Sequence, residues 1–146
     1  MKRIPNNYVR FFLMRNTLSR SESLKSYKLI RLLFNNGNSF FSYPYRILFL
    51  QQKTDSNIPV KFLISVSKRK IKTAVKRNKI KRLFREAYRS QKHELISLVK
   101  PGDQQLLVAF VFVGDESIEF SQMKEKTRHA LDILQSKIDN TDQNSI

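Results

Sequence analysis

Apolar residues recur along this chain with two different periods, and each period predicts a different kind of element. The first run has spacings of three and four: Leu24, Tyr27, Ile30, Leu33 and Phe34. Such spacing is typical of an amphipathic helix, which we expect over about 22–35. The tripeptide Asn35-Asn36-Gly37 follows. Since Asn and Gly can adopt the left-handed conformation that ends a helix, we expect the helix to stop there.

The next part of the chain has the shorter period of a β-sheet. Aromatic and β-branched residues fill 39–51 with Pro44 among them, which predicts a short strand, a break and a second strand over about 45–51. The segment 53–59 has the Asp, Ser, Asn and Pro composition of a turn. Phe62, Ile64 and Val66 then alternate with less apolar neighbours, which indicates a half-buried strand.

The remaining pattern adds two helices and one strand. Thr73 is a candidate N-cap for a helix that runs to about Gln91. The continuous apolar run 106–113 indicates a strand buried on both faces. A last helix over about 119–137 has this apolar stripe: Phe120, Met123, Thr127, Ala130, Leu131 and Leu134. The order of elements predicts an α+β fold, a single-domain α/β sandwich in which three helices cover a small mixed sheet of about four strands.

The length of 146 residues corresponds to one domain. We expect a basic arm over 1–20, a folded RNA-binding domain over 21–138 and a disordered polar tail over 139–146. The chain has no cysteine, which excludes disulfides, thiolate zinc sites and cysteine nucleophiles and fits the reducing cytoplasm. No apolar run approaches the ~18–20 residues of a transmembrane helix. We also expect no partner at a membrane surface, because the apolar face of the basic helix up to Gln91 is needed for packing.

Charge narrows the possible functions. The chain has 28 Lys and Arg against 12 Asp and Glu, a net charge of +16 that attracts polyanions such as RNA, DNA or an acidic membrane surface. The basic residues concentrate between 61 and 92, where Glu86 is the only acidic residue. One segment therefore forms the surface that faces a polyanion.

The predicted helix 73–91 has one apolar face and one cationic face. At 100° per residue the packing stripe gathers around Ile80 and contains Leu83, Phe84, Ala87 and Tyr88. The opposite arc contains Asn78, Lys81, Arg82, Arg85 and Arg89. Like charges on one face repel each other, and a phosphate backbone relieves that repulsion. A DNA-reading helix-turn-helix protein is a rival interpretation, but it should be largely helical, whereas here a strand and a basic loop precede the helix.

The sequence offers no arrangement for catalysis by the protein itself. His93 and His129 are not spaced as a metal-binding pair, and the acidic residues are scattered. We therefore expect no catalytic residue, no bound metal or other cofactor, and no small-molecule substrate.

The central segment resembles the signature of the bacterial ribonuclease P protein subunit. The resemblance is carried by the strand Ile64–Lys68, the short basic loop, and the run from Arg77 to Ala87, whose motif Arg77-Asn78-Lys79 has lysine where the family has a second arginine. It extends over roughly residues 18–138. The loop 68–72 departs from the family by lacking glycine and being about one residue longer, and Ile30 stands where many members have phenylalanine.

The resemblance implies a non-catalytic subunit of an RNA-based endoribonuclease. In this family the RNA subunit uses Mg²⁺ to cleave precursor tRNA, and the protein binds the catalytic RNA and the 5′ leader to support 5′ maturation of tRNA. A left-handed βαβ crossover around the basic helix is also implied. The alternative is a ribosomal or other structural RNA-binding protein without a processing role.

Two sets of site residues follow from the resemblance and from the chemistry of single-stranded RNA, which stacks on aromatic side chains beside a charged track. The expected RNA-binding set is Lys68, Arg69, Lys70, Lys72, Lys76, Arg77, Asn78, Lys79, Lys81, Arg82, Arg85 and Arg89. The expected leader-binding cleft has an apolar floor of Ile30, Phe34, Ile47 and Phe49, with Lys81 and Arg85 at its edge. Periodicity alone would also allow Phe34 and Phe49 to be ordinary core residues.

Overall fold

The computed structural model describes residues 18–54, 56–99 and 104–144. In chain order the elements are the 3-10 helix η1 (Arg20–Glu22), α2 (Tyr27–Asn36), β1 (Asn38–Ser42), β2 (Tyr45–Lys53), β3 (Val60–Val66), α3 (Ala74–Gln91), α4 (His93–Leu98), β4 (Gln104–Phe112) and α5 (Phe120–Asn144). Most of the expected N-terminal arm lies outside the described residues.

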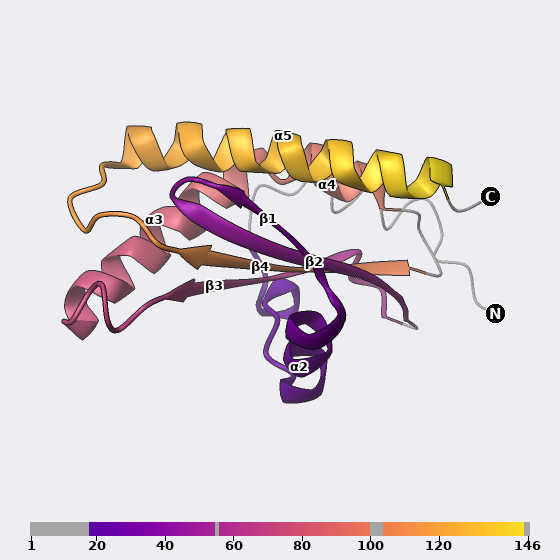
Figure 1. The fold of residues 1–146 in the computed structure, drawn as a ribbon, viewed down its shortest axis with the longest axis horizontal. Helices are drawn as coiled ribbons and strands as arrows, with labels where there is room; N and C mark the ends of the chain where they lie inside the picture. The colour runs from indigo at the N-terminus through magenta and orange to yellow at the C-terminus, as the bar shows by residue number, and fades with distance from the viewer. Residues whose placement is uncertain (1–17, 55, 100–103, 145–146) are drawn as a thin grey trace.

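The four strands form one mixed sheet in the order β1-β2-β4-β3. β2 pairs antiparallel with β1 and β4, while β3 pairs parallel with β4. Helices α3 and α5 cover one face and α2 covers the other (Figure 1). The predicted α+β sandwich is therefore confirmed.

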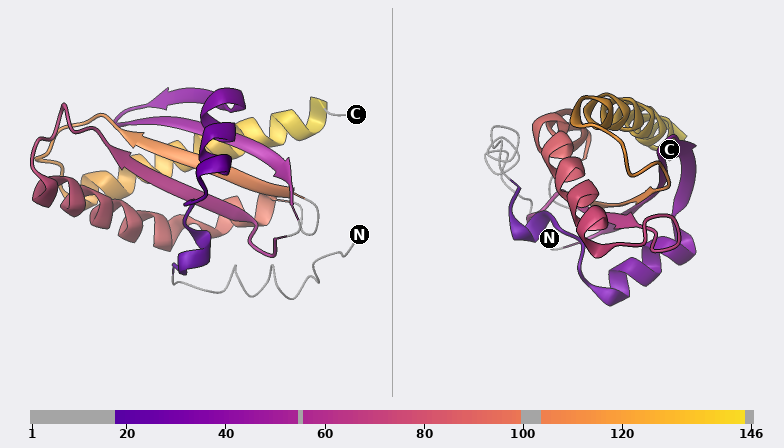
Figure 2. Two further views of the ribbon diagram at one scale, coloured as in Figure 1. Left: turned by 90° about the horizontal axis from the view of Figure 1, so that it is seen from below. Right: turned by 90° about the vertical axis from the view of Figure 1, so that its left-hand side faces the viewer.

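The parallel pair β3 and β4 is joined through α3 and α4. Helix α3 lies on the same side of the sheet as α5 and runs along its β3 edge (Figure 2). With that side toward the viewer and the strands pointing upward, β4 stands to the left of β3, so the crossover is left-handed. The general preference for right-handed crossovers would have predicted the opposite hand for this connection.

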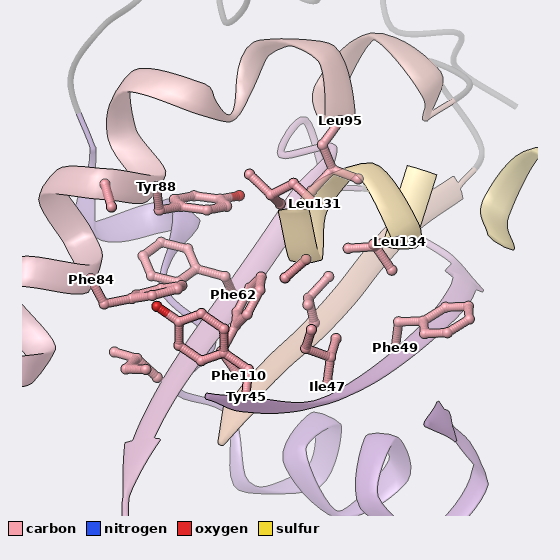
Figure 3. Packing of buried hydrophobic residues seen from close by; sticks show 14 of the residues in the cluster. Tyr45, Ile47, Phe49, Phe62, Phe84, Tyr88, Leu95, Phe110, Leu131 and Leu134 are labelled. Atoms are coloured by element: carbon pink, nitrogen blue, oxygen red, sulfur yellow. The ribbon is translucent and has the colours of Figure 1, made fainter. Parts of the chain in front are cut away.

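The core face of the sheet lies under α5 and α3. Aromatic rings from three strands and one helix meet there: Tyr45, Phe62, Phe84, Tyr88 and Phe110 (Figure 3). Ring centroids lie 4.4 Å apart for Phe62 and Tyr88 and 4.7 Å apart for Phe84 and Phe110. This packing explains why α3 has one apolar stripe, because Ile80, Phe84, Ala87 and Tyr88 are its buried residues. Thr73 caps the helix as predicted, accepting a hydrogen bond from the Lys76 amide.

Helix α2 begins five residues later than the pattern predicts. Leu24 is buried, but its amide donates to the Phe62 carbonyl at 2.8 Å, so the chain is extended there along the free edge of β3. The helix starts only after Ser26, whose hydroxyl accepts from the Leu29 amide. Gly37 follows the helix with φ of −73°, so it does not take the expected left-handed conformation. Glycine is needed there because a Cβ would lie 2.4 Å from the Leu33 carbonyl oxygen.

Helix α5 extends farther than the pattern predicts. Its buried stripe contains Met123, Thr127, Ala130, Leu131 and Leu134, as expected, and continues to Ile138. The expected disordered tail over 139–146 is therefore wrong for 139–144, which are helical. Phe120 was expected in the stripe, but it is 41% exposed at the first turn.

A buried ion pair ties the N-terminal segment to the junction between α3 and α4. Lys92 Nζ lies 2.7 Å from Glu22 Oε1, and both side chains are almost completely inaccessible. The other carboxylate oxygen of Glu22 accepts from the Ser19 amide at 2.7 Å. This pair fixes η1, and with it the approach to α2, against the end of the basic helix.

Candidate nucleic-acid interface

Helix α3 presents a set of cations that no residue in the described part of the chain neutralises. Lys79, Lys81, Arg82 and Arg85 have no ion pair or hydrogen bond to acceptors in the described part of the chain. Lys81 is half-buried, and the other three are exposed. The apolar stripe faces the sheet, so these cations point away from the core. Such a surface fits a phosphate backbone.

Two acidic residues compensate neighbouring cations. The Arg89 guanidinium lies 2.9 Å from Glu86 Oε1 and also bonds Oε2, and these hydrogen bonds hold the pKa of Glu86 below its usual range. Lys76 Nζ lies 3.1 Å from Glu116 Oε1 across the loop before α5. Arg89 and Lys76 therefore already have intramolecular counterions, although both pairs are open to solvent, which weakens them.

The basic loop before α3 is held in place by its own cations. Arg77 Nη1 donates to the carbonyls of Ile71 at 2.8 Å and Lys72 at 2.9 Å. Lys70 Nζ donates to the Val113 carbonyl at 2.7 Å, and the Ile71 side chain is buried. These contacts give Arg77 and Lys70 a structural role that sequence reasoning did not distinguish from RNA contact.

The loop cations Lys68, Arg69 and Lys72 are exposed, as is Asn78 on the first turns of α3. The loop leads directly into α3, so the expected RNA-binding residues lie on two consecutive parts of the structure, the basic loop and the helix. Whether each member touches RNA stays a prediction.

The expected apolar floor of the leader cleft needs a correction. Ile47 is 0% and Phe49 6% exposed, and both pack into the core beneath α5 (Figure 3). Ile30 packs against the opposite face of the sheet, with the α2 cluster. Because successive residues of a strand point to opposite faces, Ile47 and Phe49 cannot line one surface together with Ile30. They are core residues.

The side chains of β2 that do lie on the α2 face belong to the residues that follow Ile47 and Phe49 in the sequence, Leu48 and Leu50. Leu48 and Leu50 pack with Leu33, Leu107 and Ala109 under α2 and are only half-buried. Of the residues expected from α2, Ile30 is half-buried and Phe34 is 46% exposed. The sequence contained only a weak signal for this register, because Arg46 alternates in phase with Leu48, but Gln51 and Gln52 are both polar and point to opposite faces.

Lys81 and Arg85 were expected at the edge of the same cleft. They lie on α3, which runs along the β3 edge of the sheet, whereas α2 packs across β2 and β4 (Figure 2). The open part of the α2 face and the cations of α3 are thus neighbouring surfaces, separated by the edge strand β3.

The histidines and acidic residues do not assemble a metal site. Among residues 18–54, 56–99 and 104–144, no group of three or more His, Asp or Glu side chains is arranged to hold a metal ion. His93 lines a polar cavity of about 190 Å³ between α4 and α5, where burial and the neighbouring Lys92 lower its pKa. His129 is exposed on α5. In the same ranges, no helix is long and apolar enough to span a bilayer.

The fold and this surface define a single-domain α+β protein of the RNA-binding class, in which a four-stranded sheet carries a cationic helix at its edge. A family model described as Ribonuclease P matches residues 18–135. A ribonuclease P protein component from Porphyromonas gingivalis is 34% identical over 114 residues, which cover 78% of this chain and 83% of that protein. One from Chlorobium phaeobacteroides is 35% identical over 109 residues, covering 68% and 73%. The chain therefore belongs to the ribonuclease P protein family.

Solved structures support the same fold. The RNase P protein of Staphylococcus aureus superposes with a TM-score of 0.58 at 21% identity, covering 77% of this chain and 94% of that one. The RNase P protein from Thermotoga maritima gives 0.57 at 23% identity, covering 79% and 96%. At these identities the similarity concerns the fold, including the four-stranded mixed sheet.

Proposed function

We propose that this chain is the protein component of ribonuclease P that binds the catalytic RNA and the 5′ leader of precursor tRNA, and so supports 5′ maturation of tRNA. The observation that carries this proposal is the row of uncompensated cations on α3 beside an open, partly apolar sheet face. One surface suits phosphates and the other suits unpaired bases, which is the combination that single-stranded RNA requires.

The α3 surface and the basic loop contact the phosphates of the catalytic RNA in this proposal. Lys79, Lys81, Arg82 and Arg85 repel each other in the free protein, and a phosphate backbone removes that cost on binding. Arginine can grip two phosphate oxygens at once, while lysine acts as a point charge, so Lys79 retains attraction but not bidentate geometry.

The leader lies on the α2 face of the sheet. Phe34 offers an exposed ring near the end of α2, and Ile30, one helical turn earlier, and Leu48 supply half-buried apolar surface in the cluster under α2. In this assignment Ile47 and Phe49 no longer belong to the leader surface, because both are buried in the core. An RNA strand that leaves this sheet face over β3 would then meet the positive charges of Lys81 and Arg85.

The protein takes no chemical step. Mg²⁺ is used by the RNA subunit to cleave the phosphodiester, and the protein positions the substrate and shields phosphate repulsion in the cytoplasm. This division of roles fits a chain whose described histidines and carboxylates form no cluster suited to acid–base or metal-assisted hydrolysis.

The test is a reconstituted processing reaction. The protein is added to a bacterial catalytic RNA and precursor tRNA at low Mg²⁺, where RNA alone is slow because phosphate repulsion is poorly screened. We expect release of the 5′ leader to accelerate with protein and the protein alone to cleave nothing. A matched reaction with the exposed α5 variant Lys126→Ala should behave as the unmodified protein does. No acceleration at any Mg²⁺ concentration would contradict the proposal and favour a structural RNA-binding role.

A further inference from the structure

An exposed aromatic ring on the edge strand β1 meets no other ring among the described residues. Phe41 is 63% exposed and makes no ring contact in the described part of the chain. Its direct neighbour across the β1–β2 ladder is Arg46, which is also exposed. Arg46 has neither an ion pair nor a side-chain hydrogen bond to any described residue.

The register places this pair on the α2 face. The preceding pair, Phe40 and Ile47, points the other way, because the Phe40 ring packs edge-on against Phe49 at 6.1 Å within the core. Phe41 and Arg46 therefore share a face with Leu48. The ladder continues from Arg46 to Val111 and from Val111 to Ser65, and both of these residues are half-buried.

These cross-strand neighbours form one row across the sheet, the Phe41 row: Phe41, Arg46, Val111 and Ser65. The Phe41 row lies next to the surface that α2 covers. The neighbouring row contains Leu48, Ala109 and Leu63, which pack under α2. Rows on one face are two residues apart, roughly 6.6 Å along the strands. The Phe41 row is thus one step farther along the same sheet face as the proposed leader surface, toward the strand end where β3 leads into the basic loop 68–72.

We propose that Phe41 and Arg46 form a stacking platform that extends the leader surface by a nucleotide of single-stranded RNA, the base lying on the Phe41 ring and its phosphate meeting the Arg46 guanidinium. This inference rests on the proposed function, because it assigns a further contact to the same RNA segment. A ring beside an unpaired guanidinium provides both groups that sequence-tolerant binding of single strands uses.

Charge selects RNA over a second copy of the chain. The platform is followed at its β3 end by Lys68, Arg69 and Lys72, and the whole chain has a net charge of +16. Two copies meeting at this face would bring like charges together, whereas a polynucleotide supplies the opposite charge.

The experiment uses the reconstituted holoenzyme with precursor tRNAs whose leaders increase one nucleotide at a time. Affinity of the unmodified protein should rise with leader length in steps until the surface is filled. Phe41→Ala should lose the contribution of one later nucleotide, roughly five- to a hundred-fold in affinity. Precursors with leaders too short to reach the platform should bind equally well, and Phe41→Trp should restore the lost step.

Phe120→Ala is the matched control, because it removes another exposed phenylalanine, 41% accessible, from the start of α5. Arg46→Gln should weaken the same step as Phe41→Ala and reduce its salt dependence. If Phe41→Ala matches Phe120→Ala at every leader length while the unmodified protein still gains affinity with length, the platform is wrong and the leader surface stands. If even the unmodified protein gains nothing with length, the proposed leader binding itself fails, and the platform with it.

Sedimentation of the free protein tests the remaining alternative, in which a second copy of the chain covers the Phe41 ring. We expect Phe41→Ala and the unmodified chain to have the same mass in solution. A dimer that Phe41→Ala dissociates would show that a second copy covers the ring, and would overturn the assignment to RNA.

Discussion

At the scale of single residues, the ion pair between Glu22 and Lys92 is the clearest case in which charge is used inside the fold. Both groups are buried, and their contact of 2.7 Å joins the segment before α2 to the end of α3. Removing one member of a buried pair leaves an unpaired charge away from water, which is more costly than removing both.

This asymmetry gives a prediction. Lys92→Met should lower the free energy of unfolding by about 3–5 kcal/mol, because the Glu22 carboxylate remains buried without its cation. The double variant Glu22→Gln with Lys92→Met should recover a large part of that loss. Urea denaturation measures both, and Arg89→Met, which breaks the exposed pair with Glu86, serves as the control and should change stability little. Equal losses in the single and double variants would show that packing, and not charge, dominates at this site.

At the scale of elements, helix α3 has an apolar face and a cationic face, and the sequence pattern predicts both. Its buried stripe anchors it to the sheet, and its opposite face carries the cations. The helix was predictable because its apolar residues repeat with the helical period and Thr73 caps its start.

The cationic face of α3 predicts a change in salt dependence. Lys81→Ala with Arg85→Ala should weaken binding to the catalytic RNA and reduce the slope of log K against log [salt] by about 2, if each side chain neutralises one phosphate. The double variant Lys126→Ala with Arg128→Ala removes the same two residue types from the exposed face of α5 and should leave the slope nearly unchanged. Binding titrations between 50 and 200 mM salt decide the matter, and an unaltered slope for the α3 variant would remove these residues from the interface.

Strand β2 shows where sequence reasoning stops. Tyr45, Ile47 and Phe49 are apolar, and so are Leu48 and Leu50, so the strand was predictable but its facing was ambiguous. Phe49 was assigned to the RNA surface although the alternative of a core residue had been left open. In the structure Phe49 is a core residue, because α5 lies over that face of the sheet and the aromatic cluster fills the space between them. The start of α2 and the continuation of α5 past Lys137 likewise depend on tertiary partners, Phe62 for Leu24 and the core for Ile138.

At the scale of the whole molecule, the sheet separates two tasks. One face is sealed by α3 and α5 and supplies the stability, while the other is only partly covered by α2 and leaves aromatic and cationic groups open. The left-handed crossover places α3 at the β3 edge, so its cations adjoin the open face. Strand order and crossover hand result from long-range packing, which no local pattern in the sequence encodes.

The net charge of +16 gives opposite salt effects on stability and on binding. In the free protein, self-repulsion opposes the compact state, so raising NaCl from 50 to 200 mM should raise Tm through screening. Affinity for the catalytic RNA should fall over the same range, because binding releases counterions. Lys79→Gln with Arg82→Gln removes two uncompensated charges and should raise Tm at low salt and flatten its rise. Thermal unfolding followed by circular dichroism measures this, and a Tm that falls with salt in the unmodified protein would mean that attractive ion pairs, not repulsion, dominate its surface.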